Sequence, residues 1–196
     1  HALLIFDEVQ AGFGRCGKMW GFEHYDVRAD MIACGKGIGS GLPISAVIGN
    51  SEWMDAFPPG SMTSTHTGNP ICCAAALANI KKVVEGGLIE NAAKLESVLR
   101  DRVEAIQEKY PARVGKVAAT GLVAAIQMVP EHGSLEPDHD SAFDVVKYAV
   151  EHGLMLFAPV GWGGGTVKLS PPLSITEEQL AEGMDVLDSA FAAVCV

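Results

Sequence analysis

The feature that most constrains this chain is a short apolar segment that runs directly into two acidic residues. Residues 2–6 are mostly apolar, and Asp7 and Glu8 follow at once. A short apolar run closed by charge is typical of a strand that is buried on both faces, as in a parallel sheet. Open sheets of this kind bind ligands at the carboxyl ends of their strands. We therefore predict an α/β fold in which the Asp7 carboxylate lies at the ligand-binding edge.

Length and composition indicate a folded chain of one to one and a half domains and argue against nucleic acid and membranes as partners. The chain has 196 residues, is 48% hydrophobic and 19% charged, and carries a formal net charge of −10. An acidic chain is a poor match for nucleic acid or for an anionic membrane surface. No apolar run has the length of a membrane-spanning helix, and no signal peptide is recognised. We expect a cytoplasmic protein, and a start inside a strand without Met suggests that an N-terminal part is missing.

The cysteines and histidines do not indicate a metal site. The number of cysteines is odd and none forms a C-x-x-C pair, so reduced thiols are expected and zinc is not. The five are Cys16, Cys34, Cys72, Cys73 and Cys195. The histidines are scattered along the chain without the spacing of metal ligands.

Alternating strand and helix signals continue along the whole chain. Strands are predicted at residues 31–34, 44–49, 121–129, 154–158 and 166–170. Helices are predicted at residues 51–57, 71–85, 88–110, 141–152 and 177–194, with an irregular loop at residues 12–30. Apolar residues at three- or four-residue steps predict one apolar stripe along the helix at residues 88–110. Asn69 and Pro70 mark a helix start, Ser51 is expected to cap the short helix, and Thr176 opens a capping box. The Gly86–Gly87 pair is the best domain boundary, which gives domains of residues 1–86 and 87–196.

Lys36 is the second residue that indicates chemistry. It follows an apolar strand and stands between Gly35 and Gly37, a poor position for a solvated surface lysine. Burial and nearby cations lower a lysine pKa, which makes the amine usable as a Schiff-base nucleophile. Asp7 and Lys36 both follow strands, so both can line one edge of the sheet. An acid that keeps a pyridine nitrogen protonated and a lysine that binds the aldehyde fit a pyridoxal phosphate site.

Two further motifs have competing explanations. Residues 64–70 place hydroxyl groups and a glycine before a helix N-terminus, an arrangement that binds phosphate; ordinary helix capping by Asn69–Pro70 explains the same residues. Gly12, Gly14 and Gly17 match the G-x-G-x-x-G dinucleotide fingerprint. The residues around these glycines do not fit that fingerprint, because acids separate the strand from the first glycine and no clear amphipathic helix follows.

The motifs together resemble a known family. The segment LIFDEVQAGFGR, residues 4–15, is similar to the signature of class III (omega; ornithine/4-aminobutyrate type) aminotransferases, which are fold-type I enzymes that use pyridoxal 5'-phosphate. The similarity continues through residues 35–37, 64–65, 68–70 and 170–173, over nearly the whole chain. It implies part of the large parallel-sheet domain plus the complete small C-terminal α+β domain.

The resemblance also implies roles for single residues. Asp7 would pair with the pyridine nitrogen, Val9 would pack on one face of the ring, and Gln10 would reach the ring hydroxyl. Lys36 would form the internal aldimine and move the proton between substrate and cofactor. Thr65 would bind the cofactor phosphate across the interface of a homodimer.

Three positions depart from the family pattern. Ala11 replaces the usual threonine, and His66–Thr67 stands where an aromatic residue and a glycine are common. Lys168 stands where several members have an arginine for the substrate carboxylate. Lysine keeps that charge but loses the bidentate recognition of a carboxylate.

The implied function is transfer of an amino group from an amine or omega-amino acid to a 2-oxo acid by a ping-pong Schiff-base mechanism. Because one fold supports several reactions, a decarboxylase, racemase or aminomutase is the alternative. A third hypothesis is a non-catalytic fragment. In this family the loop that binds the cofactor phosphate and the aromatic residue that stacks on the cofactor ring lie before the position of His1. The segment by itself is therefore expected to be inactive.

Overall fold

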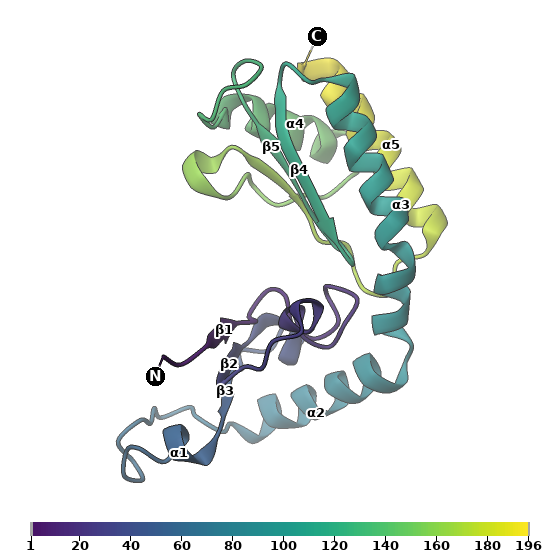
Figure 1. Ribbon diagram of the computed structural model, residues 1–196. Helices are drawn as coiled ribbons and strands as arrows, with labels where there is room; N and C mark the ends of the chain where they lie inside the picture. The colour runs from purple at the N-terminus through teal and green to yellow at the C-terminus, as the bar shows by residue number, and fades with distance from the viewer. Residues whose placement is uncertain (1, 196) are drawn as a thin grey trace. The chain divides into compact units, whose positions relative to one another are not determined.

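A computed structural model describes residues 2–195, and the chain divides into two compact units, His1–Ala93 and Lys94–Val196. Each unit contains a three-stranded sheet (Figure 1). The expected domain boundary at Gly86–Gly87 lies between α2 (Pro70–Glu85) and α3 (Leu88–Lys109), whereas the division between the two units falls inside α3. The domain ranges 1–86 and 87–196 stay a prediction.

The sheet of the first unit has the order β1 (Ile5–Asp7), β2 (Met31–Cys34) and β3 (Ala46–Gly49). β1 and β2 are parallel, as predicted, with Asp7 opposite Ala33. β3 runs antiparallel to β2, so the sheet is mixed. Between β1 and β2 the chain is irregular, as expected, except for the short 3-10 helix η1 (Gly21–Tyr25).

The prediction that β1 is buried on both faces is wrong for this chain. Leu4 is 42% exposed and Ile5 is 58% exposed. β1 pairs only with β2, and its second edge meets no other strand among residues 2–195. The apolar sequence is that of an inner strand, but residues 2–195 cover it only in part, where the ring of Phe22 lies 5.0 Å from that of Phe6.

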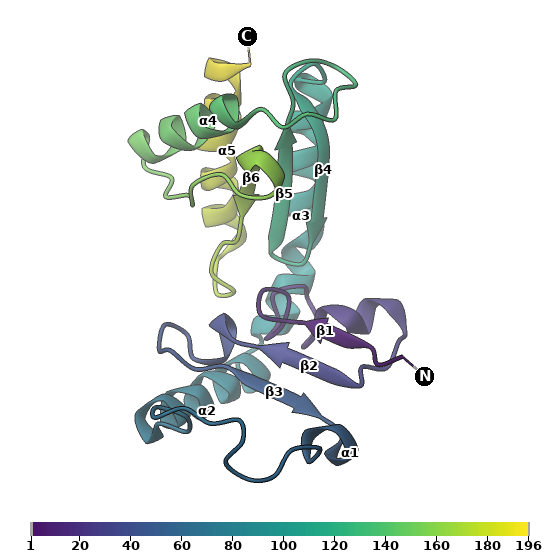
Figure 2. The same ribbon diagram turned by 90° about the vertical axis from the view of Figure 1, so that its left-hand side faces the viewer.

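Helix α2 packs against the sheet of the first unit, and the small core of that unit lies between them (Figure 2). Phe13, Cys34, Ile38 and Ala76 make one buried cluster, in which α2 contributes Ala76. The predicted start of α2 is confirmed, because the Asn69 side chain accepts hydrogen bonds from the backbone N–H groups of the first turn at 3.0 and 3.3 Å.

The short helix before α2 differs in detail from its prediction. α1 covers only Ser51–Met54, and Asn50, not Ser51, occupies its N-cap position. The Asn50 side chain makes no capping hydrogen bond there. A four-residue helix without a side-chain cap ends early because each of its termini leaves backbone groups unpaired.

The second unit has an antiparallel sheet with three helices. The strands are β4 (Val114–Thr120), β5 (Val123–Met128) and β6 (Thr166–Leu169), in that order. α3 is joined by α4 (His139–Glu151), α5 (Glu177–Val194) and the 3-10 turn η3 (Trp162–Gly164). The apolar stripe predicted on α3 is confirmed. Its buried members are Ala92, Leu95, Leu99, Val103 and Ile106, all at most 3% exposed.

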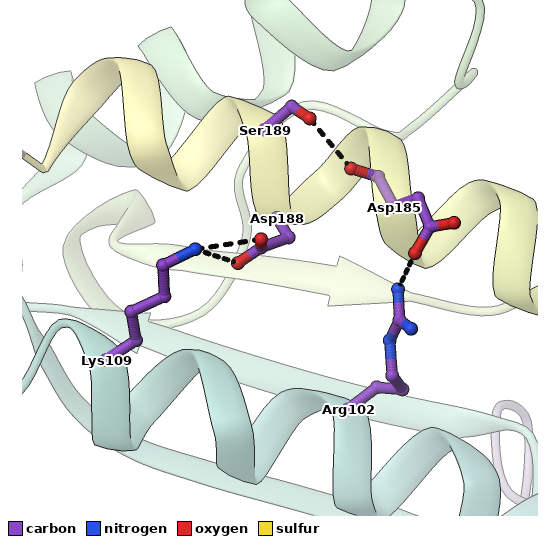
Figure 3. A network of polar contacts seen from close by, with 5 residues as sticks. All are labelled: Arg102, Lys109, Asp185, Asp188 and Ser189. Carbon is purple, nitrogen blue, oxygen red and sulfur yellow. Dashed lines mark hydrogen bonds and ion pairs between the residues drawn. The ribbon is translucent and has the colours of Figure 1, made fainter.

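α3 and α5 run side by side in the same direction and are joined by ion pairs (Figure 3). Arg102 pairs with Asp185, and Lys109 pairs with Asp188 at 2.9 Å. Residue numbers rise together on both helices, which fixes their parallel orientation. The hydrogen bond to Asp188 is the main reason why the pKa of Lys109 is raised, with a second bond to Tyr110 adding to it. These pairs are exposed, so they contribute little compared with the buried faces below them.

Two strand predictions in the second unit need correction. β4 was not predicted, because its sequence VGKVAAT contains small residues in place of clear apolar alternation. The strand predicted at residues 154–158 is wrong: this run pairs with no strand, and the chain reaches the sheet only at Val160, which bridges to Thr166. Pro159 lacks an N–H group and interrupts the pairing before that point.

Replacing Thr176 with alanine is expected to lower the free energy of unfolding by about 1 kcal/mol. The Thr176 hydroxyl accepts the Gln179 N–H at 3.2 Å, and the Gln179 side chain accepts the Thr176 N–H at 3.1 Å, which confirms the predicted capping box. Urea denaturation of the full-length protein measures the change. Thr176→Ser keeps the hydroxyl and serves as the control; an equal loss in both variants would contradict the capping role.

Among residues 2–195, no helix is long and apolar enough to cross a membrane. The same residues contain no group of three or more possible metal ligands.

Candidate active site

Asp7 and Lys36 lie at the same edge of the first sheet. β1 and β2 are parallel with Asp7 opposite Ala33, and Lys36 follows Ala33 by three residues. The carboxyl ends of both strands therefore point to one edge, as the sequence predicted. The Asp7 Oδ1 atom accepts the Val9 N–H at 3.1 Å, which fixes the carboxylate against its own turn.

The Lys36 amine lies close to a second predicted residue. Its Nζ atom donates to Gln10 Oε1 at 3.1 Å. The expectation that Lys36 is withdrawn from solvent is wrong for this chain, where both Lys36 and Asp7 are exposed.

The backbone around Lys36 is held in an unusual conformation. Lys36 opens the single-turn 3-10 helix η2 (Lys36–Ile38) with a φ of 33°, in the left-handed region that side chains other than glycine rarely adopt. Gly35 lies beside Val9, because a Cβ atom at Gly35 would stand 3.7 Å from Val9 Cγ1. Lys36, Gln10 and Val9 therefore form one group with Asp7.

The residue before this loop has a packing role. Cys34 is 1% exposed and its thiol donates to the Ala46 carbonyl at 3.4 Å. Burial raises the pKa of the Cys34 thiol, and the bond to Ala46 opposes that effect more weakly. A neutral buried thiol is suited to packing and not to nucleophilic chemistry.

Glu8 is a residue whose role the sequence did not reveal. It is 2% exposed, and its two carboxylate oxygens accept the N–H groups of Gly21 and Phe22 at 2.8 and 2.9 Å. These bonds hold the glycine-containing loop back against the end of β1. The sequence shows the acidic pair Asp7–Glu8 but does not indicate which of the two carboxylates is buried.

Among residues 2–195, no hydrogen bond or ion pair links Thr65 to this group. It lies exposed in the loop before α2, where Ser64 and Thr67 bond each other through their hydroxyl groups at 2.8 Å. The capping of α2 by Asn69 is the role that the structure shows for this stretch. Phosphate binding by Thr65 stays a prediction.

Lys168 belongs to the second unit. It lies on β6, and its Nζ atom stands 4.9 Å from the centre of the Phe157 ring. Both residues line a mainly apolar cavity of about 440 Å³. Ser170 also lines this cavity, and its buried hydroxyl has no hydrogen-bond partner among residues 2–195.

Comparison with protein families identifies the family to which this chain belongs. The family model of class III aminotransferases matches residues 1–191. The chain belongs to the class III aminotransferases. The family uses pyridoxal phosphate, so the resemblance of the opening motif and of the Lys36 motif is confirmed together with the cofactor.

Curated relatives of this class III chain include enzymes of more than one activity. An isoleucine 2-epimerase of Lentilactobacillus buchneri is 37% identical over 99% of the chain and 43% of its own length. A probable 4-aminobutyrate aminotransferase of Bacillus subtilis is 35% identical over 97% of the chain and 43% of its own length. The chain thus spans less than half the length of these relatives.

Solved structures agree on the fold. An acetylornithine aminotransferase from Elizabethkingia anophelis is 36% identical and superposes with a TM-score of 0.85, covering 98% of this chain and 46% of that one. This confirms the predicted fold-type I class.

The residues present fit pyridoxal phosphate. The edge of the first sheet offers a primary amine from Lys36, a carboxylate from Asp7 and an amide from Gln10. An amine can hold the cofactor's aldehyde carbon, a carboxylate can accept a hydrogen bond from its protonated ring nitrogen, and an amide can donate to its ring oxygen.

Proposed function

We propose that the full-length protein that carries this segment is a pyridoxal phosphate-dependent aminotransferase. It would move an amino group from an amine or an omega-amino acid of the 4-aminobutyrate or ornithine kind to a 2-oxo acid. The observation that carries the proposal is the Lys36 amine bonded to Gln10 at the sheet edge where Asp7 lies. The relatives that are aminotransferases support the same assignment.

Bound pyridoxal phosphate supplies an electron sink for the electrons released when the substrate carbon loses its proton. Lys36 would hold the cofactor in the resting enzyme and then carry that proton between two carbon atoms. Asp7 would keep the ring nitrogen protonated by accepting its hydrogen bond. A primary amine and a fixed carboxylate suit these two tasks, and the Val9 N–H already orients the carboxylate.

The other predicted residues would bind and orient. Val9 would pack against one ring face and Gln10 would donate to the ring oxygen. Thr65 would bind the phosphate in the site of a second subunit, which makes the full-length enzyme a homodimer. Lys168, beside a mainly apolar cavity, would attract a substrate carboxylate. We propose that the 196-residue segment is inactive by itself, because Asp7 and Lys36 are exposed in it.

Reduction of the full-length enzyme with borohydride tests the proposal. We expect a pyridoxyl group fixed on Lys36, identified by mass spectrometry of the peptide that contains it. Lys81, exposed on α2, is the internal comparison and should carry none. A pyridoxyl group on any lysine other than Lys36 would refute the assignment.

Racemisation or epimerisation of an amino acid is a second candidate, favoured by the relative that is an isoleucine 2-epimerase. It needs the same lysine but no acceptor. Incubating the enzyme with an amino acid, with and without 2-oxoglutarate or pyruvate, separates the two reactions. Dependence on the 2-oxo acid supports transfer, whereas inversion of the α-carbon without it supports the second candidate.

A further inference from the structure

One side chain outside the predicted set holds the loop of Lys36. The Asn79 side chain, on α2, donates through Nδ2 to the Gly37 carbonyl at 2.6 Å and to the Ile38 carbonyl at 3.3 Å. Both partners are acceptors, so only the amide nitrogen can make these bonds. The contact joins segments that are 42 residues apart in the sequence.

The two carbonyls belong to the residues that directly follow Lys36. They lie in η2, and a helix leaves the carbonyls of its last turn without internal partners. Asn79 supplies the missing donor from a neighbouring helix. A backbone hydrogen bond from the Ile38 N–H to the Gly35 carbonyl, at 2.9 Å, also closes this turn.

Packing leaves the loop little room to move elsewhere. Ile38 is 8% exposed in the core cluster, and a Cβ atom at Gly37 would stand only 3.1 Å from the Phe13 Cβ atom. Lys36 itself keeps a positive φ, which a lysine does not hold without support from its surroundings. Asn79 adds directional hydrogen bonds to this packing at Gly37 and Ile38, directly after Lys36.

We propose that Asn79 is a positioning residue that fixes the backbone of Lys36, so that the lysine amine is held toward Gln10. The inference rests on the proposed function, in which Lys36 performs the proton transfer. Asn79 does not touch the reacting atoms; it acts through the carbonyls of Gly37 and Ile38. A small shift of a catalytic group lowers the rate strongly, so loss of this hold should act on turnover more than on substrate binding.

The test compares Asn79→Asp with Val83→Ala in the full-length enzyme. Aspartate has the size of asparagine, but its carboxylate cannot donate and repels both carbonyls. Val83 lies on the same helix, is 3% exposed and is not part of the core cluster that contains Ile38, so Val83→Ala weakens helix packing and leaves the Asn79 side chain unchanged. We expect kcat of Asn79→Asp to fall at least about tenfold with little change in KM, and kcat of Val83→Ala to stay near that of the wild type.

Hydrogen–deuterium exchange of the peptide around residues 36–38 gives a readout that does not depend on activity. Exchange should accelerate in Asn79→Asp, with and without cofactor, and stay unchanged in Val83→Ala. Asn79→Leu removes the donor without adding charge and should show the same direction of change if Asn79→Asp does not fold. Unchanged exchange and kcat, or equal losses of kcat in both helix variants, would overturn the proposal.

The exchange readout separates the two claims. If the wild-type enzyme carries no pyridoxyl group on Lys36 after borohydride, the proposed function fails. Faster exchange in Asn79→Asp would then still show that Asn79 holds this loop, and unchanged exchange would refute that as well.

Discussion

Replacing Lys36 with alanine is expected to lower amino transfer by the full-length enzyme at least about a thousandfold. Alanine cannot hold the cofactor covalently, and it removes the group that moves the proton at the substrate carbon. The measurement is the steady-state rate with a saturating amine donor and a 2-oxo acid acceptor. Absorbance of the purified protein in the visible range reports whether the cofactor is still held.

A matched control separates loss of chemistry from loss of structure. Lys81→Ala removes an exposed lysine of α2 and should leave the rate within about twofold of the wild type, as expected for a surface substitution. Circular dichroism of the Lys36→Ala variant, compared with that of the wild type, shows whether the fold is kept. Turnover retained by Lys36→Ala would exclude this lysine as the catalytic base.

Replacing Phe191 with alanine is expected to lower the free energy of unfolding by about 3–5 kcal/mol. Phe191 on α5 is 0% exposed, and its ring stacks on that of Tyr110 with 6.2 Å between the centroids. The substitution removes buried apolar area and leaves a cavity that the neighbouring helices fill only in part. Urea denaturation followed by fluorescence measures the change.

Phe143→Ala is the comparison for this substitution, since Phe143 lies in the same unit but is 49% exposed. It should cost less than about 1.5 kcal/mol because about half of the side chain already contacts water. Equal costs for the two phenylalanines would contradict the assignment of Phe191 to the core.

The sequence predicted those parts of the fold in which local chemistry and packing agree. The start of α2 at Asn69–Pro70 and the capping box at Thr176 are confirmed because a cap depends only on residues a few positions apart. The stripe on α3 is confirmed because helical periodicity and burial coincide there. The structure of a segment can be predicted from its sequence where the local signals and the tertiary packing favour the same structure.

The wrong predictions concern strands, whose structure depends on pairing with or burial by other segments. β4 is made a strand by its pairing with β5, and its own small residues carry no alternation that predicts it. Residues 154–158 form a continuous apolar run, but this run finds no partner strand before Val160. The exposure of Ile5 has the same origin, since the burial of a strand depends on chains or segments that cover it.

For the site, the sequence indicated Asp7 and Lys36 at one edge of the sheet, which the strand pairing confirms, while their chemical roles stay predictions. The bond from Lys36 to Gln10, at 3.1 Å, was not predicted. Glu8 and Asn79 escaped notice because each acts on backbone groups far away in the sequence, which no spacing rule describes. A hydrogen bond to a distant backbone group is independent of the partner's side chain, so it leaves no local pattern in the sequence.

The uncovered edge of β1 decides how this protein is best handled in the laboratory. Its free N–H and C=O groups lie beside the apolar side chains of Leu4 and Ile5, a combination that recruits further strands. A segment produced by itself would offer this edge to its own copies, and self-association would compete with folding. Experiments on these residues should therefore use the full-length protein, in which a neighbouring strand can pair with this edge.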